Sequence, residues 1–197
     1  MVNAPGSGRP RVVLIGPPGA GKTTVGALLA QRLGVAWRDT DPAIEAATGR
    51  RIADIFIEDG EPAFRALERE EVARSLAGHD GVLALGGGAV LDPQTQALMA
   101  GHMVVFLDVG VADAAKRVGF DRSRPLLLVN PRAQLVKLMA ARRPLYHALA
   151  TIRVDTEGRS PQQVVEQIVA SLTPPPAPSS DTPPTPTPPT CQNRAGS

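Results

Sequence analysis

The stretch GPPGAGKTT, residues 16–24, constrains the fold most, because it joins the apolar run VVLI to the helical pattern GALLAQRL. Gly16, Gly21, Lys22 and Thr23 match the pattern G-x-x-x-x-G-K-[ST]. Four specified positions recur by chance in a chain of this size at roughly the one-in-a-hundred level. The glycines let backbone N–H groups face phosphate oxygens, and the following helix adds its positive end. A strand, a phosphate-binding loop and a helix are therefore predicted in this order.

A loop of this type gives its side chains defined tasks. Lys22 is expected to reach the β- and γ-phosphates of a nucleotide, and the hydroxyl of Thr23 is expected to lie on Mg²⁺. The alternative is a glycine-rich turn that merely contains a lysine. The strand before the loop and the helix after it favour the nucleotide site.

Apolar runs alternate with helical patterns along most of the chain. This alternation predicts an α/β domain with a parallel sheet covered by helices on both faces. In such folds ligands bind outside the carboxyl ends of the strands, so the residues after each run are the candidates for a site. The expected strands are residues 11–15, 35–37, 81–85, 102–109 and 150–154, and the expected helices are residues 25–33, 42–49, 61–78, 92–101, 111–119, 131–149 and 160–172.

The C-terminal part has a different composition, TPPPAPSSDTPPTPTPPT over residues 173–190. It lacks apolar residues to bury, so residues 173–197 are expected to be disordered and inclined to polyproline II conformation. Such a tail is either passive or a ligand for SH3-like modules. Residues 1–10 are expected to be flexible, which leaves one folded domain of about residues 11–172.

The charge balance excludes several classes of function. The 21 basic and 19 acidic residues give a net charge of +2, and the excess is not gathered into a basic run with aromatic residues. No nucleic-acid or membrane partner is therefore expected. The single cysteine, Cys191, gives neither a disulfide nor a cysteine metal site. Without an apolar signal region or a long apolar run, we expect a soluble cytoplasmic protein.

Two aspartates follow the second expected strand, in RDTDPAIE. Asp39 and Asp41 are two residues apart, which in an extended segment places both carboxylates on the same side. Beside a phosphate-binding loop, one would hold a Mg²⁺-bound water and the other would face a hydroxyl acceptor. Each has a structural alternative: Asp41, followed by Pro42, is a good helix N-cap, and Asp39 suits a turn.

Three glycines, Gly86, Gly87 and Gly88, stand where the third strand is expected to end. They would let a ligand approach the backbone closely, with N–H groups free to donate. The alternative is a flexible turn. The expected position near the phosphate-binding loop favours a ligand.

Several arginines are candidates, and each has an ordinary alternative. Arg65 fits an i,i+4 surface pair with Glu61. Arg142 and Arg143 end a helical pattern, where cations suit the helix dipole. Arg117 is expected either to contact a nucleotide base or to be a solvated helix residue.

The stretch VGFDRSRPLLLVNP follows the helical pattern that carries Arg117. It contains Arg122 and Arg124, a candidate glycine hinge and a proline. We expect a mobile basic lid over the phosphates, about residues 119–130.

In this order, GPPGAGKT, DTD, DGExxFRxLE, LGGGAV, SRPLL and RRPLY closely resemble the motifs of the shikimate kinases over about residues 11–172. The resemblance implies the nucleoside-monophosphate-kinase-like P-loop fold, three layers with a five-stranded parallel sheet of order 2-3-1-4-5. It implies ATP-dependent phosphorylation of the 3-hydroxyl of shikimate, in aromatic amino-acid biosynthesis. It also implies a Mg²⁺ ion bound with ATP, and a monomer.

The resemblance also assigns roles to residues at matching positions. Lys22, Asp41 and Arg124 would be catalytic. Shikimate would contact Asp41, Arg65, Gly86, Gly87, Gly88 and Arg142; Mg²⁺ would lie on Thr23 with Asp39 in its outer shell; and ATP would contact Gly19, Ala20, Gly21, Lys22, Thr23, Thr24, Arg117 and Arg124.

The chain departs from the family pattern at RRPLY, where an arginine, one variable residue and PLY are expected. Arg142 is the matching position, and Arg143 stands at the variable one as an alternative carboxylate-binding residue.

Two other functions compete with a shikimate kinase. One is a gluconate-type P-loop kinase, which LGGGAV and SRPLL disfavour; the other is a nucleotide-dependent switch, for which the chain lacks an N-K-x-D guanine signature.

Overall fold

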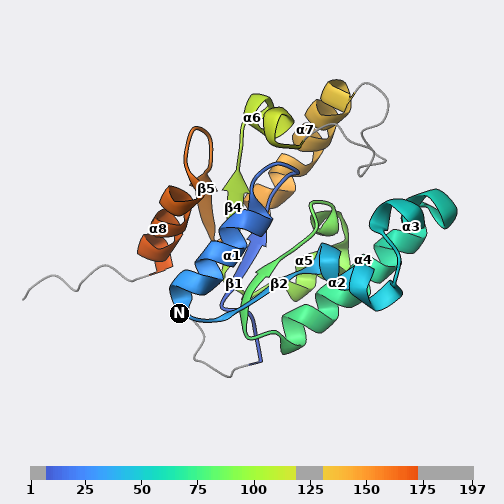
Figure 1. Cartoon of the computed structure of the whole chain (residues 1–197), viewed down its shortest axis with the longest axis horizontal. Coiled ribbons are helices and arrows are strands. Elements are labelled where there is room, and N and C mark those ends of the chain that lie inside the picture. Colours follow the sequence, from blue (N-terminus) through green and yellow to red (C-terminus); the bar gives the residue numbers. More distant parts are fainter. Residues whose placement is uncertain (1–7, 119–130, 173–197) are drawn as a thin grey trace, which may run out of the picture.

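A parallel five-stranded sheet forms the centre of the computed structural model, which describes residues 8–118 and 131–172 (Figure 1). The strand order β2-β3-β1-β4-β5 confirms the predicted fold. All pairings between neighbouring strands are parallel. The strands are β1 (Val12–Ile15), β2 (Ala36–Asp39), β3 (Gly81–Ala84), β4 (Val104–Asp108) and β5 (Ile152–Asp155).

Helices cover both faces of this sheet (Figure 1). The three central strands are wholly buried, which explains why they read as continuous apolar runs rather than as alternating ones. The helices are α1 (Lys22–Leu33), α2 (Thr40–Thr48), α3 (Ile52–Glu58), α4 (Gly60–Gly78), α5 (Pro93–Leu98), α6 (Val111–Val118), α7 (Pro131–Leu149) and α8 (Pro161–Leu172), with one turn of 3₁₀-helix, η1 (Ala89–Leu91).

Successive residues of the three central strands enter two different cores, because side chains alternate across a sheet. Val12 and Leu14 of β1 pack in one core with α1, α8 and the first half of α7. Val13 and Ile15 pack in the other core with α4, η1 and Tyr146 of α7. Alternation within one strand therefore holds the two helix layers in fixed positions around the sheet.

A third, smaller cluster joins helices α2, α3 and α4 to one another, and it contains an element that the sequence did not predict. Ile44, Ile55 and Phe64 are its buried members, with Phe56 against Phe64 at a ring distance of 4.7 Å. The expected helices omitted α3, which has only seven residues. A helix this short has little intrinsic stability, so its formation depends on packing against α2 and α4.

Some predicted boundaries differ from the observed ones. β2 ends at Asp39 rather than at Trp37, so the first of the two aspartates belongs to the strand. Helix α4 begins at Gly60 rather than at Glu61. Pro62 is tolerated there because N–H groups in the first turn have no partner inside the helix.

Three predicted segments lie wholly or partly outside the described residues. These are the flexible N-terminus, of which only residues 8–10 are described, the lid at 119–130 with Arg124, and the Pro-rich tail from residue 173. In the described parts of the chain, no helix combines the length and the apolarity that crossing a bilayer requires.

Candidate active site

The phosphate-binding loop connects β1 to α1 and leaves the N-terminus of α1 open. Gly21 is the N-cap residue, with a left-handed φ of 90°, and it makes no side-chain capping hydrogen bond to the first turn. The first turn of α1 has no acidic residue. Backbone N–H groups and the helix dipole therefore offer a site for an anion.

Lys22 curls back over this loop. Its Nζ donates to the carbonyl oxygens of Gly16, at 2.8 Å, and Pro17, at 3.2 Å. These contacts hold the ammonium group at the centre of the loop, where the predicted β- and γ-phosphates would lie.

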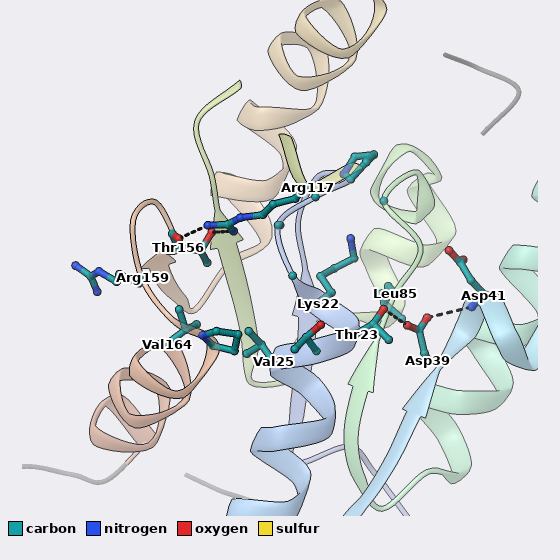
Figure 2. Close-up of a pocket in the computed structure, with 17 residues that line it drawn as sticks. Lys22, Thr23, Val25, Asp39, Asp41, Leu85, Arg117, Thr156, Arg159 and Val164 are labelled. Atoms are coloured by element: carbon teal, nitrogen blue, oxygen red, sulfur yellow. Dashed lines mark hydrogen bonds between the residues drawn. The ribbon is translucent and has the colours of Figure 1, made fainter. Parts of the chain in front are cut away.

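The two aspartates converge on this loop from the end of β2 (Figure 2). The Thr23 hydroxyl donates to Asp39 Oδ2 at 2.8 Å, and the backbone N–H of Asp41 donates to Asp39 Oδ1 at 3.2 Å. Asp39 is therefore the N-cap of α2, and the structural alternative that made Asp41 the N-cap is wrong. Pro42 suggested a helix that begins at residue 42 with Asp41 as its cap. The helix begins two residues earlier, at Thr40.

Thr40 ties the end of β2 to the three consecutive glycines Gly86, Gly87 and Gly88, the glycine segment. Its side chain is fully buried, and its Oγ1 accepts a hydrogen bond from Gly86 N at 3.0 Å. The ends of β2 and β3 are thereby tied together, with Asp39 and Asp41 on either side of the tie.

A cavity of ≈ 410 Å³ opens along the carboxyl ends of the strands (Figure 2). Both aspartates face it, as does Arg117 from α6. The segment after β3 contributes Leu85 and Gly87. The phosphate-binding loop with the start of α1, and the start of α8 with the loop before it, contribute the rest: Pro18, Gly19, Ala20, Gly21, Lys22, Thr23, Thr24, Val25, Thr156, Arg159, Pro161 and Val164.

The glycine segment borders a second group of charged side chains beside this cavity. A Cβ on Gly86 would lie 2.8 Å from Asp41 Oδ1 and would also meet Glu68 Oε1. A Cβ on Gly88 would meet the guanidinium group of Arg65. Glycine at these two positions therefore leaves room for a carboxylate pair on one side and an arginine on the other.

Arg65 has two acidic partners within its own helix. Its Nη2 donates to Glu61 Oε1 at 2.9 Å, so the predicted surface pair exists, and its Nη1 donates to Glu68 Oε2 at 2.5 Å. Glu68 is only 4% exposed, and burial raises its pKa while Arg65 opposes that rise. Sequence reasoning overlooked Glu68, although its i,i+3 spacing from Arg65 was a usable signal.

Arg142 meets the same glycine segment from α7. Its Nη1 donates to the carbonyl oxygen of Gly87 at 3.0 Å, and the hydroxyl of Tyr146 donates to the same oxygen at 2.6 Å. Arg142 is buried, which lowers its pKa, and burial raises the pKa of Tyr146 to about 12. Within the described residues, no carboxylate forms a salt bridge with Arg142.

Arg143, the next residue, leads away from this group. Its Nη2 donates to Asp108 Oδ2 at 2.7 Å. The alternative that Arg143 replaces Arg142 beside the glycine segment is therefore disfavoured by the direction of its side chain.

Arg117 closes the far end of the cavity (Figure 2). Its Nη2 donates to the carbonyl oxygen of Thr156 at 2.8 Å, and its Nη1 donates to the Thr156 hydroxyl at 3.2 Å. Arg159, also overlooked in the sequence, lines the cavity from the same β5–α8 loop. The signal that could have found Thr156 and Arg159 is their place in the loop that follows a strand of a parallel sheet.

Among the described residues, the Thr23 hydroxyl and the Asp39 carboxylate lie together beside the loop and could hold a metal ion. Hydroxyl and carboxylate oxygens are ligands that Mg²⁺ prefers, and Mg²⁺ takes its other ligands from phosphates and water. No group of three or more His, Cys, Asp or Glu residues that could hold a metal occurs among the described residues. The oxygen pair therefore fits Mg²⁺ carried with a nucleotide rather than a metal held by the protein alone.

Comparisons with known proteins agree with this geometry. A family model described as shikimate kinase matches residues 18–173. The shikimate kinase of Thermobifida fusca (strain YX) is 60% identical over 166 residues, which cover 84% of this chain and 96% of that protein.

Solved structures give a similar result. Shikimate kinase from Acinetobacter baumannii in complex with shikimate has a TM-score of 0.80 and 34% identity, over 84% of this chain and 93% of that chain. A gluconokinase from Sinorhizobium meliloti 1021, at 18% identity and a TM-score of 0.56 over 82% of this chain and 90% of that chain, shares the fold alone. This chain belongs to the shikimate kinase family.

Proposed function

We propose that this protein transfers the γ-phosphoryl group of ATP to the 3-hydroxyl of shikimate, giving shikimate 3-phosphate and ADP for aromatic amino-acid biosynthesis. The observation that carries the proposal is the position of Gly87. It lines the phosphate-loop cavity, and its carbonyl oxygen accepts a hydrogen bond from Arg142 at 3.0 Å. Arg142 therefore contacts a residue that lines the phosphate site.

The carboxylate of shikimate is assigned to Arg65 and Arg142. Two guanidinium groups can hold a carboxylate through forked hydrogen bonds that lysine cannot reproduce. Arg65 already has Glu68 as a counter-charge, whereas no described carboxylate forms a salt bridge with Arg142. An anionic acceptor would give the buried Arg142 a direct ion-pair partner, in addition to the more distant charge of Glu68.

Asp41 is assigned to the reacting hydroxyl. It lines the cavity, and its Oδ1 and the carboxyl group of Glu68 both lie in the room that the missing side chain of Gly86 leaves. Its main task is to orient the 3-hydroxyl toward the phosphate, because a loose phosphoryl-transfer transition state asks little of the nucleophile.

The nucleotide is assigned to the phosphate-binding loop and the Arg117 end of the cavity. Lys22 would exchange its loop carbonyl partners for phosphate oxygens, and Arg117, held by Thr156, would flank the base. Thr23 would hold Mg²⁺ with Asp39 in its outer shell; when bound, the ion neutralises charge between the β- and γ-phosphates. Arg124 is assigned to the transferring group on the resemblance alone, because it lies outside the described residues.

The proposed enzyme works as a monomer in the cytoplasm. The monomer is proposed from the family resemblance. ATP, the proposed donor, supports the compartment.

The direct test is a coupled assay of ADP release with MgATP and a panel of acceptors: shikimate, gluconate and none. We expect release that depends on shikimate. Release with gluconate instead would keep a P-loop kinase and overturn the acceptor assignment. ATP binding without ADP release for every acceptor would favour a nucleotide-dependent switch.

A further inference from the structure

The two consecutive arginines Arg142 and Arg143 lie within α7, before its internal Pro144, and point to different partners. Arg142 is buried and donates to the carbonyl oxygen of Gly87, whereas Arg143 is 49% exposed and donates to Asp108 Oδ2 at 2.7 Å. Consecutive residues of a helix lie about 100° apart around its axis. The direction of one side chain therefore fixes the direction of the other.

Asp108 is a firm anchor for this contact. It is the last residue of β4, it is buried, and it pairs in register with Asp155 of the neighbouring strand β5. Its Oδ2 also accepts from Arg153 Nε at 2.9 Å, and its carbonyl oxygen accepts from Thr156 N at 2.8 Å. The sheet therefore holds the carboxylate in place, and α7 must adapt to it.

The helix needs such an anchor at this point because Pro144 follows Arg143 directly. Proline has no N–H group, so the hydrogen bond to the carbonyl oxygen four residues earlier is absent and the helix is prone to bend there. In Figure 1, α7 lies against the β4 side of the sheet, so a contact to the end of β4 can set its rotation.

We propose that Arg143 is a positioning residue: its ion pair with Asp108 sets the rotation of α7, so that Arg142 faces the glycine segment and the acceptor carboxylate. Arg143 itself does not touch the acceptor. The inference rests on the proposed function, since it concerns how the acceptor site is held.

Two substitutions at residue 143 test the role. Arg143→Met removes the ion pair, and we expect the KM for shikimate to rise about tenfold, a loss of about 1.4 kcal/mol, with the KM for ATP and kcat within about twofold. Arg143→Lys keeps a positive charge beside Asp108 and should recover most of the affinity. A lower thermal midpoint with an unchanged KM for shikimate would overturn the proposal, because it would indicate a structural role only.

Arg153→Met is the matched control. It removes the other arginine from Asp108 but lies on β5 rather than α7, so the KM for shikimate should stay within about twofold of the wild type. An increase as large as that of Arg143→Met would overturn the proposal, because the effect would then follow from any loss of charge at Asp108.

A double-mutant cycle with Asp108→Asn separates positioning from direct contact. If Arg143 acts through Asp108, Arg143→Met should add little in the Asp108→Asn background. A full additional loss of shikimate affinity there would mean that Arg143 contacts the acceptor itself. If Asp108→Asn does not fold, Arg143→Met and Arg143→Lys still test whether Arg143 positions Arg142.

The wild-type assay distinguishes this inference from the proposed function. Absence of shikimate-dependent ADP release in the wild type would end the proposed function before any variant is made. Normal wild-type turnover with an unchanged KM in Arg143→Met would end the inference alone.

Discussion

At the scale of single residues, Arg65, the proposed carboxylate-binding residue, already has two acidic partners. Its guanidinium group is held by Glu61, which is 46% exposed, and by Glu68, which is 4% exposed. Exposed ion pairs contribute only about 0–1 kcal/mol, so an incoming carboxylate can displace Glu61 easily. The buried Glu68 would stay and keep the guanidinium group oriented.

Replacement of Arg65 with alanine should reduce kcat/KM for shikimate by about a hundredfold or more, because loss of one partner of a hydrogen-bonded charge pair costs about 2–5 kcal/mol. Lys22→Ala should instead lower turnover with every acceptor. Steady-state kinetics with shikimate and ATP varied in turn would check both. Arg69→Ala, on the same helix and 41% exposed, is the control and should be almost neutral. Normal shikimate turnover by Arg65→Ala would refute the carboxylate assignment.

Gly26 allows helix α1 to approach the side chain of Trp37 closely. It lies in α1, and a Cβ there would overlap the indole ring of Trp37 on β2. Contact between the helix of the phosphate-binding loop and the edge strand therefore requires the absence of a side chain.

For this reason Gly26→Ala should destabilise the protein by about 1–2 kcal/mol, although alanine favours a helix by about 1 kcal/mol over glycine. Urea unfolding followed by circular dichroism would measure the change. Gly78→Ala is the matched control, because a Cβ at the end of α4 meets nothing within 4 Å. It should be neutral or slightly stabilising, and equal effects at the two sites would contradict the packing argument.

At the scale of elements, an ion network joins β2 to α4. Arg38 Nη2 donates to Glu71 Oε1 at 2.7 Å, and the hydroxyl of Ser75 donates to the same oxygen at 2.7 Å. Glu71 is 3% exposed, whereas Arg38 is 39% exposed. The strand that ends in Asp39 is thereby attached to the helix that carries Arg65.

The difference in exposure predicts an asymmetry. Arg38→Met should destabilise the protein by about 1–3 kcal/mol, because it leaves the buried Glu71 with the more exposed Arg74 and the hydroxyl of Ser75 as its described partners. Glu71→Leu should cost less, since the guanidinium group of Arg38 can turn toward water. The double variant should lie within about 1 kcal/mol of the wild type, because an apolar pair can replace a buried ion pair. Chemical denaturation of the three variants would measure this, and a larger loss in Glu71→Leu than in Arg38→Met would contradict it.

At the scale of the whole molecule, the two ends of the sheet have different tasks. The candidate site occupies the carboxyl ends of the strands. His79 and His102 lie just before β3 and β4, at the opposite end, and burial lowers the pKa of both. The stability of the fold can therefore respond to pH at a place remote from the site.

The sign of that response follows from linkage. A histidine with a lowered pKa in the folded state binds its proton more readily when unfolded, so its stabilising contribution is full above the unfolded value of about 6.5 and decreases as pH falls below it. Each residue can contribute a slope of at most about 1.4 kcal/mol per pH unit. Urea unfolding between pH 5.5 and 7.5 should show stability falling toward acid. The double variant His79→Gln, His102→Gln should flatten this profile, and an unchanged slope would exclude these histidines as the cause.

The sequence by itself determined the parts that depend on short-range patterns. The phosphate-binding loop requires glycines, a lysine and a threonine at fixed spacing between a strand and a helix, and all of these are contiguous. The parallel sheet followed from the alternation of apolar runs and helical patterns. The strand order did not follow from periodicity, because pattern alone does not say which strands are neighbours, and it came from the family resemblance.

Only the tertiary structure decided which contacts are made by residues that lie close together in the sequence. Asp39 rather than Asp41 caps α2, because β2 continues as far as Asp39. Arg142 rather than Arg143 meets the glycine segment, and Glu68 joins Arg65 in a buried pair. The cap depends on where β2 ends, and the burial of Arg142 and Glu68 depends on how α7 and α4 are rotated against the sheet. Contacts between elements distant in the sequence set that rotation, so local pattern carries no information about it.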